Sequence, residues 1–548
     1  MDLKQSITIP IGNEQLNSIA ASGLSRTTRT LTALLVLCSI IFLVARKWKN
    51  RHFEKLAATF PGPTPLPIVG NAMEFLLSDP ERIMSKLIEL KGRFQSPFRF
   101  WLGTKLCVVI AKPADLQIVL NSSKVLEKDD VYRFFRNTVG TGLFSAPVEK
   151  WKKTRKAVTP AFNAKLLEQF MPVFNERNII LIEKLKPHCG DGVEFDIWPY
   201  ISSLALDIIC QTALGVKINT QDNENSDFAT ALMRASELDY LRIYKPWLHP
   251  DFIFDRVSYA KELREVYKTL HGLPKEVIQR RKKEFELNKK FIEENNQNMP
   301  EKGKQMRVFL DILLELNDQG IQEFTEKDML DEVVTMMIGG SETSAVTNCF
   351  CILLLAMHKE VQDKVFEEQL SIFDGENRPV TVEDLGKMIY TEQVIKETLR
   401  MFPAGPVFLR TVKEDTKITG DHVLPAGTTA VIAPLMTHTS PDIWPEPQKF
   451  NPDNFTAENL EKKHRYSFIP FSGGPRGCIG SRYAMMSMKT TISTFIRNYE
   501  VTTSMKQEDI KLRVDLLIRS VHGWNMKLSP RIYPNSDSQE VLNRQKIE

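Results

Sequence analysis

The segment that most constrains this chain is FSGGPRGCIG, residues 471–480, where a single cysteine lies among glycines, a proline and an arginine. Glycines let the backbone turn sharply and approach a flat ligand closely. The residues after Cys478 predict a helix over 481–499, whose positive N-terminal end would lie beside the sulfur. We expect backbone amides, this helix end and nearby Arg476 to lower the pKa of the Cys478 thiol and hold a thiolate.

A thiolate in this setting indicates a metal ligand, although most buried cysteines are inert small apolar residues. Zinc sites need several ligands, and the chain contains no C-x-x-C or H-E-x-x-H motif. A single soft ligand suits the axial position of haem iron. The cysteines are too scattered for a disulfide framework, which predicts reduced thiols facing the cytosol; they are Cys38, Cys107, Cys189, Cys210, Cys349, Cys351 and Cys478.

Charge and length exclude some classes of protein. The 72 Lys and Arg residues nearly balance 68 Asp and Glu residues, which gives a net charge of +4. The basic residues form short clusters without interleaved aromatic residues, so we predict no nucleic-acid partner. A chain of 548 residues is long enough to bury one large catalytic core.

A membrane anchor is predicted at residues 30–45, TLTALLVLCSIIFLVA, which carry no charge and are followed directly by RKWKNR. As a helix this segment would span about 24 Å. The basic residues after it outnumber those before it, which places the bulk of the chain in the cytosol. We predict the endoplasmic reticulum membrane; the alternative is a mitochondrial location, because residues 1–29 are rich in Ser and Thr and poor in acids.

The rest of the chain predicts a mainly α protein with small β-sheets. Strand pairs are expected at 99–112 and 422–435, and most other segments have helical patterns. The predicted organisation is a polar leader (1–29), a transmembrane anchor (30–45), a basic stop with a proline-rich hinge (46–70), a single catalytic domain (71–530) and a polar tail (531–548).

A long helix is predicted at 325–362, opening with a capping box of Thr325 and Asp328. Its middle is apolar nearly all round, as expected for a helix that crosses a large core. The stretch GGSETS at 339–344 interrupts it with glycines, hydroxyl groups and Glu342. A glycine pair alone would favour close helix packing, whereas a carboxylate in the interior is costly unless it is paired or used.

The pattern F-x-x-G-x-R-x-C-x-G around Cys478 resembles the haem-binding signature of the cytochrome P-450 monooxygenases. Three further segments resemble motifs of this family in the expected order: WKKTR at 151–155, GGSETS at 339–344 and EQVIKETLR at 392–400. The segments 143–162 and 207–219 look most like the fourth clan, which is large in insects. The resemblance implies the P-450 fold, with a long central helix over the haem.

The resemblance also implies roles for particular residues. Cys478 would be the axial iron ligand, with Phe471 shielding the sulfur and Gly480 letting the next helix lie against the ring. Thr343 and Glu342 would relay protons during oxygen activation. The propionates of the haem would be bound by Trp151, Arg155, Arg410 and Arg476.

Other positions are expected to shape the fold and the pocket. Glu397 and Arg400 would form a structural ion pair, which the family usually completes with an arginine where this chain has Asn454. Some members of the clan bond haem through a glutamate where this chain has Gly339, so the resemblance implies noncovalent haem b, iron protoporphyrin IX. Candidate pocket walls, equally consistent with plain core, are Phe134, Phe135, Phe408 and Leu409.

The predicted function is insertion of one oxygen atom of O2 into a lipophilic small molecule, of the fatty-acid, hormone, pheromone or xenobiotic class. Electrons would come from an NADPH-cytochrome reductase, with cytochrome b5 as a second donor. Basic residues at 152, 153, 156 and 462–465 would receive the reductase, unless they are ordinary solvated charges. The alternatives are a haem-binding membrane protein without turnover and a reductase-independent peroxide isomerase or dehydratase; Thr343 and Glu342 argue against both.

Overall fold

The structure is a computed structural model that describes residues 31–35, 37–38, 41, 50–76, 80–222, 227–295, 308–321 and 324–533. Contacts divide the chain into two units, Met1–Thr59 and Phe60–Glu548. In the first unit, α2 spans Arg51–Ala58, and the described residues of the predicted anchor are helical with exposed side chains. The leader, the remaining anchor residues and the tail from residue 534 lie outside the described residues.

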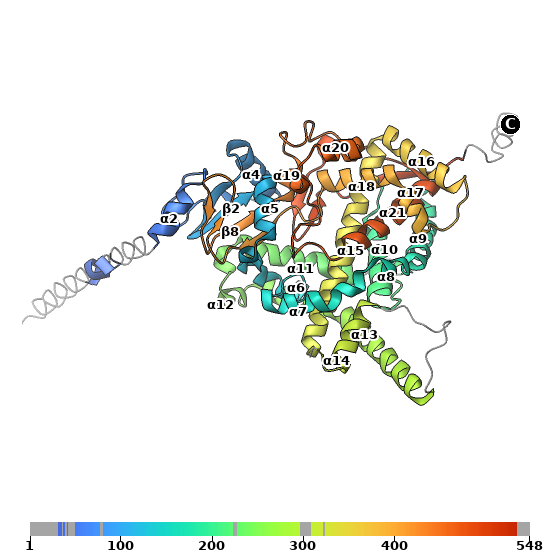
Figure 1. The fold of residues 1–548 in the computed structure, drawn as a ribbon, viewed down its shortest axis with the longest axis horizontal. Helices are drawn as coiled ribbons and strands as arrows, with labels where there is room; N and C mark the ends of the chain where they lie inside the picture. Colours follow the sequence, from blue (N-terminus) through green and yellow to red (C-terminus); the bar gives the residue numbers. More distant parts are fainter. Residues whose placement is uncertain are drawn as a thin grey trace, which may run out of the picture. The chain divides into compact units, whose positions relative to one another are not determined.

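Helices make up most of the second unit (Figure 1). The longer ones are α4 (Pro80–Arg93), α5 (Pro113–Asn121), α7 (Val148–Val158), α9 (Met171–Leu185), α10 (Trp198–Ala213), α11 (Asp227–Tyr244), α13 (Ser258–Asn295), α14 (Phe309–Asp318), α15 (Glu326–Met357), α16 (Lys359–Phe373), α18 (Ile389–Met401) and α21 (Ser481–Asn498). The short ones are α3 (Ala72–Leu76), α6 (Arg136–Val139), α8 (Ala164–Glu168), α12 (Asp251–Phe254), α17 (Val382–Lys387), α19 (Pro434–His438) and α20 (Ala457–Glu461). The prediction of a mainly α protein is confirmed.

The largest sheet among the described residues lies beside α4 and α5 at one side of this unit (Figure 1). Its strand order is β1-β2-β8-β5-β3, and only the β2–β8 pair is parallel. These strands are β1 (Phe98–Leu102), β2 (Lys105–Ile110), β3 (Glu127–Lys128), β5 (Phe408–Thr411) and β8 (Thr429–Ile432). Smaller sheets contain β4 (Phe195–Asp196), β6 (Thr416–Lys417), β7 (Val423–Leu424), β9 (Tyr499–Thr502), β10 (Leu512–Val514), β11 (Ile518–Ser520) and β12 (Asn525–Pro530).

The two predicted strand pairs have different outcomes. The pair at 99–112 is confirmed as the antiparallel hairpin of β1 and β2. The pair at 422–435 is wrong, because β7 pairs with β6 while β8 lies between β2 and β5. All four residues of β8 are buried, so this strand is more stable at the centre of the large sheet than in a two-stranded hairpin.

Helix α15 crosses the middle of the second unit (Figure 1). It begins with the predicted capping box, in which Thr325 and Asp328 bond each other's backbone amides. Among the described helices, α15 alone is long and apolar enough to cross a membrane, and 83% of its most apolar window is buried inside the protein. It therefore has the character of a core helix, which matches its extensive contact with α10.

A fully buried ion pair joins α18 to the loops that follow α19. The carboxylate of Glu397 accepts two hydrogen bonds from Arg400, at 2.7 and 2.8 Å, and both side chains are 0% exposed. Arg400 also donates to the carbonyls of His438, Pro447 and Lys449. Asn454 donates to Glu397 Oε1 at 3.1 Å, so an amide fills the place where the family usually has an arginine.

Removing the charge of Glu397 should destabilise the fold strongly. Glu397→Gln keeps the shape but leaves the Arg400 guanidinium buried without a counter-charge, which costs about 3–5 kcal/mol. Urea unfolding should show this loss as a lower midpoint at an unchanged slope. Glu383→Gln is the control, because Glu383 pairs with Lys387 on the surface and should change stability by only about 0.5 kcal/mol. Equal effects of the two substitutions would contradict this prediction.

Candidate active site

The loop at 471–480 is closed on itself before α21 begins. The amide of Cys478 donates to the carbonyl of Phe471 at 2.9 Å, and the amide of Gly477 donates to the carbonyl of Gly474 at 3.0 Å. Gly474 has φ +66°, and a Cβ there would lie 1.9 Å from the carbonyl oxygen of Leu120 on α5. Only glycine therefore fits at 474, and the close approach of the loop to α5 fixes the position of the cysteine.

The side chain of Cys478 is exposed, although dense protein surrounds it. Burial raises the pKa of its thiol, while the Gly480 amide and the Arg155 charge oppose that shift. The predicted lowering of this pKa is therefore wrong, because desolvation of a thiolate outweighs these two groups. The side chain is accessible to a ligand, and a metal cation bound there could deprotonate the thiol.

Helix α7 brings two of the predicted residues to the cysteine loop. Trp151 is buried, and the guanidinium of Arg476 stacks 4.3 Å from its ring. Arg155 lies one turn further along α7 and donates to the carbonyl of Gly477 at 3.0 Å. The structure therefore places Trp151, Arg155 and Arg476 together around the segment that carries Cys478.

Arg410 and Lys128 add two more cations to this region. They are opposite each other on the paired strands β5 and β3. The Lys128 ammonium lies over the rings of Tyr132 and Phe144, at 4.7 and 4.3 Å. Burial and the charges of Arg410 and Arg476 lower the pKa of Lys128 well below its usual range. Sequence reasoning missed Lys128, since the only signal for it is its pairing with Arg410 across the sheet.

These cations form no ion pair with a carboxylate among the residues that the structure describes. Buried guanidinium nitrogens without a hydrogen-bond acceptor are Nη1 of Arg410 and both Nε and Nη1 of Arg476. Burial lowers the pKa of Arg476 to about 9, with the charge of Arg410 adding to the effect. Unpaired buried cations are costly. Their arrangement therefore fits an anionic ligand bound beside Cys478.

The middle of α15 presents a small strip without large side chains. A Cβ added to Gly339 would meet no atom within 4 Å, so open space lies beside this turn. Thr343, one turn further along, donates its hydroxyl hydrogen to the carbonyl of Gly339 at 2.8 Å. At position 340 glycine is required for packing, because a Cβ there would lie 2.4 Å from Cδ1 of Ile209 on α10. Gly340 therefore allows close packing against α10, whereas Gly339 borders open space.

Glu342 faces a different direction from Thr343. Its side chain is buried and its Oε2 accepts a hydrogen bond from Nη2 of Arg519 on β11. Sequence reasoning missed Arg519, because nothing near β11 in the sequence resembles a catalytic motif. The carboxylate beside Thr343 is thus held by a buried guanidinium, which offsets the desolvation of both charges.

The segment between α6 and α7 is tied to the first half of α15. Thr141 donates to Asp331 at 2.6 Å, and the amide of Leu143 donates to Glu332 at 3.0 Å. Burial raises the pKa of Glu332 to about 7. Ala146, which ends this segment, accepts a hydrogen bond from Arg476 at 2.8 Å. The segment therefore connects the central helix to the cysteine loop.

The four candidate pocket walls occupy different environments. Phe134 is buried between the His249 ring, at 4.7 Å, and the Arg242 guanidinium, at 5.0 Å. Phe135 is buried against Tyr240 of α11. Phe408 and Leu409 are partly exposed on β5, next to Arg410. This arrangement leaves their role in a pocket as a prediction.

Comparisons with known proteins agree with this geometry. A family model described as Cytochrome P450 matches residues 60–521. The chain belongs to the cytochrome P450 family. It is 35% identical to cytochrome P450 4c3 of Drosophila melanogaster, over 91% of this chain and 95% of that protein. Identity to cytochrome P450 4V2 of Homo sapiens is 35%, over 93% and 96% of the two chains, and identity to cytochrome P450 4c21 of Blattella germanica is 34%, over 89% and 96%.

Membership in the family has direct consequences for the site. The relatives are members of P450 family 4, which confirms the predicted placement in the fourth clan. The protein is a monooxygenase with a haem held by a cysteine thiolate, and it uses O2, a redox partner and a lipophilic substrate. The residues present fit that group, because an accessible thiol and unpaired buried cations lie together.

Replacing Lys128 should weaken haem retention. Lys128→Met keeps the length of the side chain but removes an amino group that can bond a propionate. A charge-assisted hydrogen bond of this kind is worth enough to speed haem loss by about tenfold. Transfer of haem to apomyoglobin measures that rate. Lys124→Met is the control, because Lys124 lies on the surface and pairs with Glu414. Equal rates for both variants would show that Lys128 does not hold the haem.

Proposed function

We propose that this P450 inserts one oxygen atom of O2 into a lipophilic small molecule at a haem whose axial ligand is Cys478. The observation that carries the proposal is the accessible thiol, fixed by the closed loop at 471–480 amid unpaired buried cations. When bound, the haem supplies the oxygen chemistry and the electron transfer. No side chain at Gly339 can bond to it, which supports a noncovalent haem b.

On the cysteine side, the protein positions the cofactor and neutralises its charge. Arg410, Arg476 and Arg155 would bind the propionates, with Lys128 as a further partner. Trp151 supports Arg476 by stacking against its guanidinium. The amide of Gly480 donates to the Cys478 sulfur, and with haem bound it would temper the electron density that this sulfur supplies.

On the side of α15, Thr343 and Glu342 would transfer protons during oxygen activation. The hydroxyl of Thr343 borders the open space beside Gly339 and can rotate from the Gly339 carbonyl toward a bound ligand. Glu342 is the nearest carboxylate along the helix, and it is buried against the guanidinium of Arg519. A charged carboxylate can take a proton from water and pass it toward Thr343.

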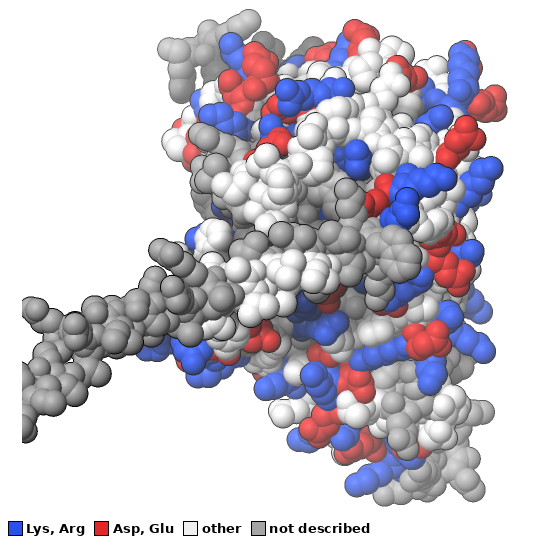
Figure 2. Space-filling model, turned by 90° about the vertical axis from the view of Figure 1, so that its left-hand side faces the viewer, with Lys and Arg blue, Asp and Glu red and all other residues white. Residues whose placement is uncertain are grey.

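The electron donor is proposed to be an NADPH-cytochrome reductase, with cytochrome b5 as a second donor. Lys152, Lys153 and Lys156 are exposed on α7, whose other face carries Trp151 and Arg155. A partner with an acidic surface could therefore dock close to the haem edge. Lys152 and Lys462 pair with Glu149 and Glu458 on the surface, which is consistent also with ordinary solvated charge. On the face drawn in Figure 2, Lys and Arg side chains are interspersed with Asp and Glu side chains, as is usual for a solvated protein surface.

We further propose that the protein is anchored in the endoplasmic reticulum membrane by residues 30–45, with the catalytic domain in the cytosol. The support is the uncharged run and the basic residues that follow it. The described residues of this segment are helical and have exposed leucine side chains, such as Leu31 and Leu35. A membrane location would supply a lipophilic substrate directly.

The first test is the spectrum of the reduced, membrane-bound protein under carbon monoxide. A thiolate opposite carbon monoxide should move the Soret band strongly to the red. Cys478→Ser should abolish that band, because a serine hydroxyl stays protonated and is a weak ligand. Cys189→Ser removes a thiol outside the cysteine loop and should keep the band. A wild-type haem band without the red shift would contradict the proposal.

The proton relay has its own test. Thr343→Ala should lower the product formed per NADPH several-fold, with the missing electrons recovered as peroxide, because oxygen is no longer protonated productively. Thr347→Ala is the matched control, since Thr347 donates to the carbonyl of Thr343 one turn along the same helix. Coupling should stay near the wild-type value in that variant. Unchanged coupling in Thr343→Ala would contradict the relay.

A further inference from the structure

The backbone at 140–146 lies directly on the first half of α15. A Cβ at Gly142 would lie 2.5 Å from Oγ1 of Thr335, so no side chain fits between the two at this point. The amide of Leu143 donates to Oε2 of Glu332 at 3.0 Å. A carboxyl group of the central helix therefore holds this segment by its main chain.

The other end of the segment contacts the cysteine loop. The amides of Ser145 and Ala146 both donate to the carbonyl of Gly142, at 3.1 and 2.9 Å, so the segment forms a compact turn. The Arg476 guanidinium donates to the carbonyl of Ala146 at 2.8 Å. A displacement of the segment at Leu143 would therefore also change the surroundings of Arg476.

Glu332 is a carboxyl group without a counter-charge. It is 0% exposed, and its Oε1 has no hydrogen-bond partner among the described residues. No Lys, Arg or His in that part of the chain forms an ion pair with it. The charge of Lys150 favours ionisation of Glu332, but Lys150 is paired with Asp328, and the charges of Asp328 and Asp331 oppose ionisation. A carboxylate buried in this way is costly, which favours the neutral acid.

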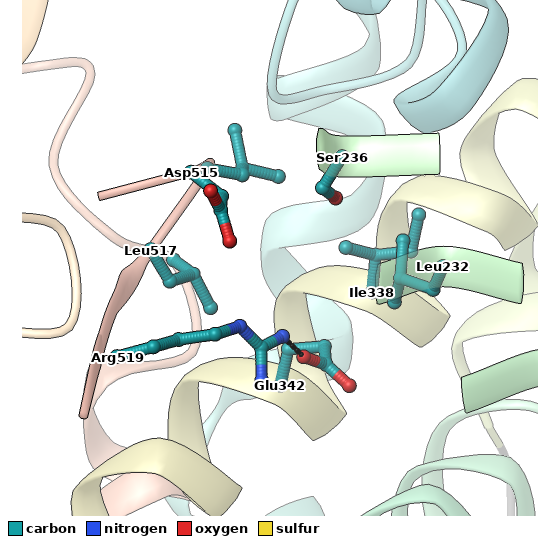
Figure 3. A pocket seen from close by; sticks show the side chains of 8 residues that line it. Leu232, Ser236, Ile338, Glu342, Asp515, Leu517 and Arg519 are labelled. Carbon is teal, nitrogen blue, oxygen red and sulfur yellow. Dashed lines mark hydrogen bonds and ion pairs between the residues drawn. The ribbon is translucent and has the colours of Figure 1, made fainter. Parts of the chain in front are cut away.

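Glu342, further along α15, has the opposite arrangement. It borders a small pocket between α11, α15 and the β10–β11 hairpin, where Arg519 is paired with it (Figure 3). The same helix thus carries one buried carboxyl group that has a cationic partner and another, Glu332, that has none in the described part of the chain.

A second buried carboxyl group holds the residues just before the segment. Asp239 on α11 is 1% exposed and accepts hydrogen bonds from the hydroxyls of Thr138 on α6 and Tyr267 on α13. Burial raises the pKa of Asp239 to about 7, although these two hydrogen bonds and the charge of Arg242 oppose the shift. Asp239 and Glu332 therefore hold adjoining parts of the chain from two different helices.

We infer that Glu332 is a positioning residue for the haem site: as a neutral acid it holds segment 140–146 closed against α15, and its ionisation releases the segment together with the contact between Ala146 and Arg476. Asp239 acts in the same way on α6. The link to the haem rests on the proposed function, in which Arg476 binds a propionate, whereas the release of the segment does not.

Burial sets the direction of the pH dependence. In the released segment Glu332 and Asp239 would be hydrated and have ordinary pKa values, whereas in the closed segment burial raises both pKa values to about 7. The closed form therefore binds more protons, so it is most stable at acidic pH and loses stability as the pH rises to about 7. His271 on α13 bonds the carbonyl of Asn137 and acts in the opposite direction; because burial lowers its pKa, its effect is confined to more acidic pH.

Hydrogen exchange of the full-length haem protein in detergent tests this inference. Mass spectrometry of peptides that cover 136–146 gives the opening equilibrium at pH 6 and at pH 7.5, after correction for the intrinsic effect of pH on exchange. Opening in the wild type should rise about 25-fold between these two values, with about fivefold from each carboxyl group. Transfer of haem to apomyoglobin should accelerate in the same direction.

Variants separate ionisation from a merely structural role. Glu332→Gln can still accept a hydrogen bond from the Leu143 amide but cannot ionise. It should slow exchange at 136–146 about tenfold at pH 7.5 and reduce the pH dependence to about fivefold, whereas loss of a structural contact would speed exchange at every pH. Adding Asp239→Asn should remove the remaining rise. Glu326→Gln is the control, because Glu326 is exposed on the first turn of α15 and should leave exchange unchanged.

The outcomes distinguish this inference from the proposed function. Wild-type exchange without this rise would overturn the inference, as would faster exchange in Glu332→Gln at pH 7.5. Slower exchange in that variant with an unchanged rate of haem transfer would overturn the link to the haem. The spectrum under carbon monoxide is recorded for each protein. If the wild type lacks the red-shifted band, the proposed haem site is rejected, while the exchange data still decide the role of Glu332.

Discussion

The fully buried pair of Glu397 and Arg400 is the interaction on which the arrangement around Cys478 depends. Arg400 binds three backbone carbonyls between residues 438 and 449, and Glu397 binds the amide of Asn451 and the side chain of Asn454. These loops have little regular structure of their own, so the ion pair replaces the hydrogen bonds of a sheet or helix. The segment before the cysteine loop is therefore held in place against α18. The loop closes against α5 because Gly474 leaves room for a backbone carbonyl.

The cations beside Cys478 need an anionic ligand to neutralise them. Arg410 comes from a strand of the large sheet, Arg155 from α7 and Arg476 from the cysteine loop, so three separate parts of the fold converge. Without an anion, their mutual repulsion and desolvation oppose folding. A dianionic haem bound between them, as proposed, would remove that cost and so link the stability of this region to the cofactor.

Sequence reasoning predicted the parts of the site that are carried by local motifs. The closed loop, the helix after Cys478, the capped central helix and the ion pair on α18 all depend on residues close together in the chain. The sequence did not predict Lys128 or Arg519 as site residues, because strand pairing and the β10–β11 hairpin bring them to the site from distant segments. The direction of the Cys478 pKa shift was wrong for a related reason, since burial depends on the whole fold. The predicted strand pair at 422–435 was wrong because β7 and β8, although neighbours in the sequence, pair with other strands and not with each other.

The β10–β11 hairpin contributes to two features of the protein at once. Its tip lines the pocket beside α15, while Arg519 on its return strand holds the carboxylate next to Thr343. A mutation that reshapes the tip can therefore also disturb the buried ion pair of Glu342 and Arg519. A change of pocket shape made through this hairpin would therefore need a compensating change at Glu342 on α15. A change at Leu232 or Ser236 of α11 avoids this coupling, because these residues line the pocket but take no part in the ion pair of Glu342 and Arg519.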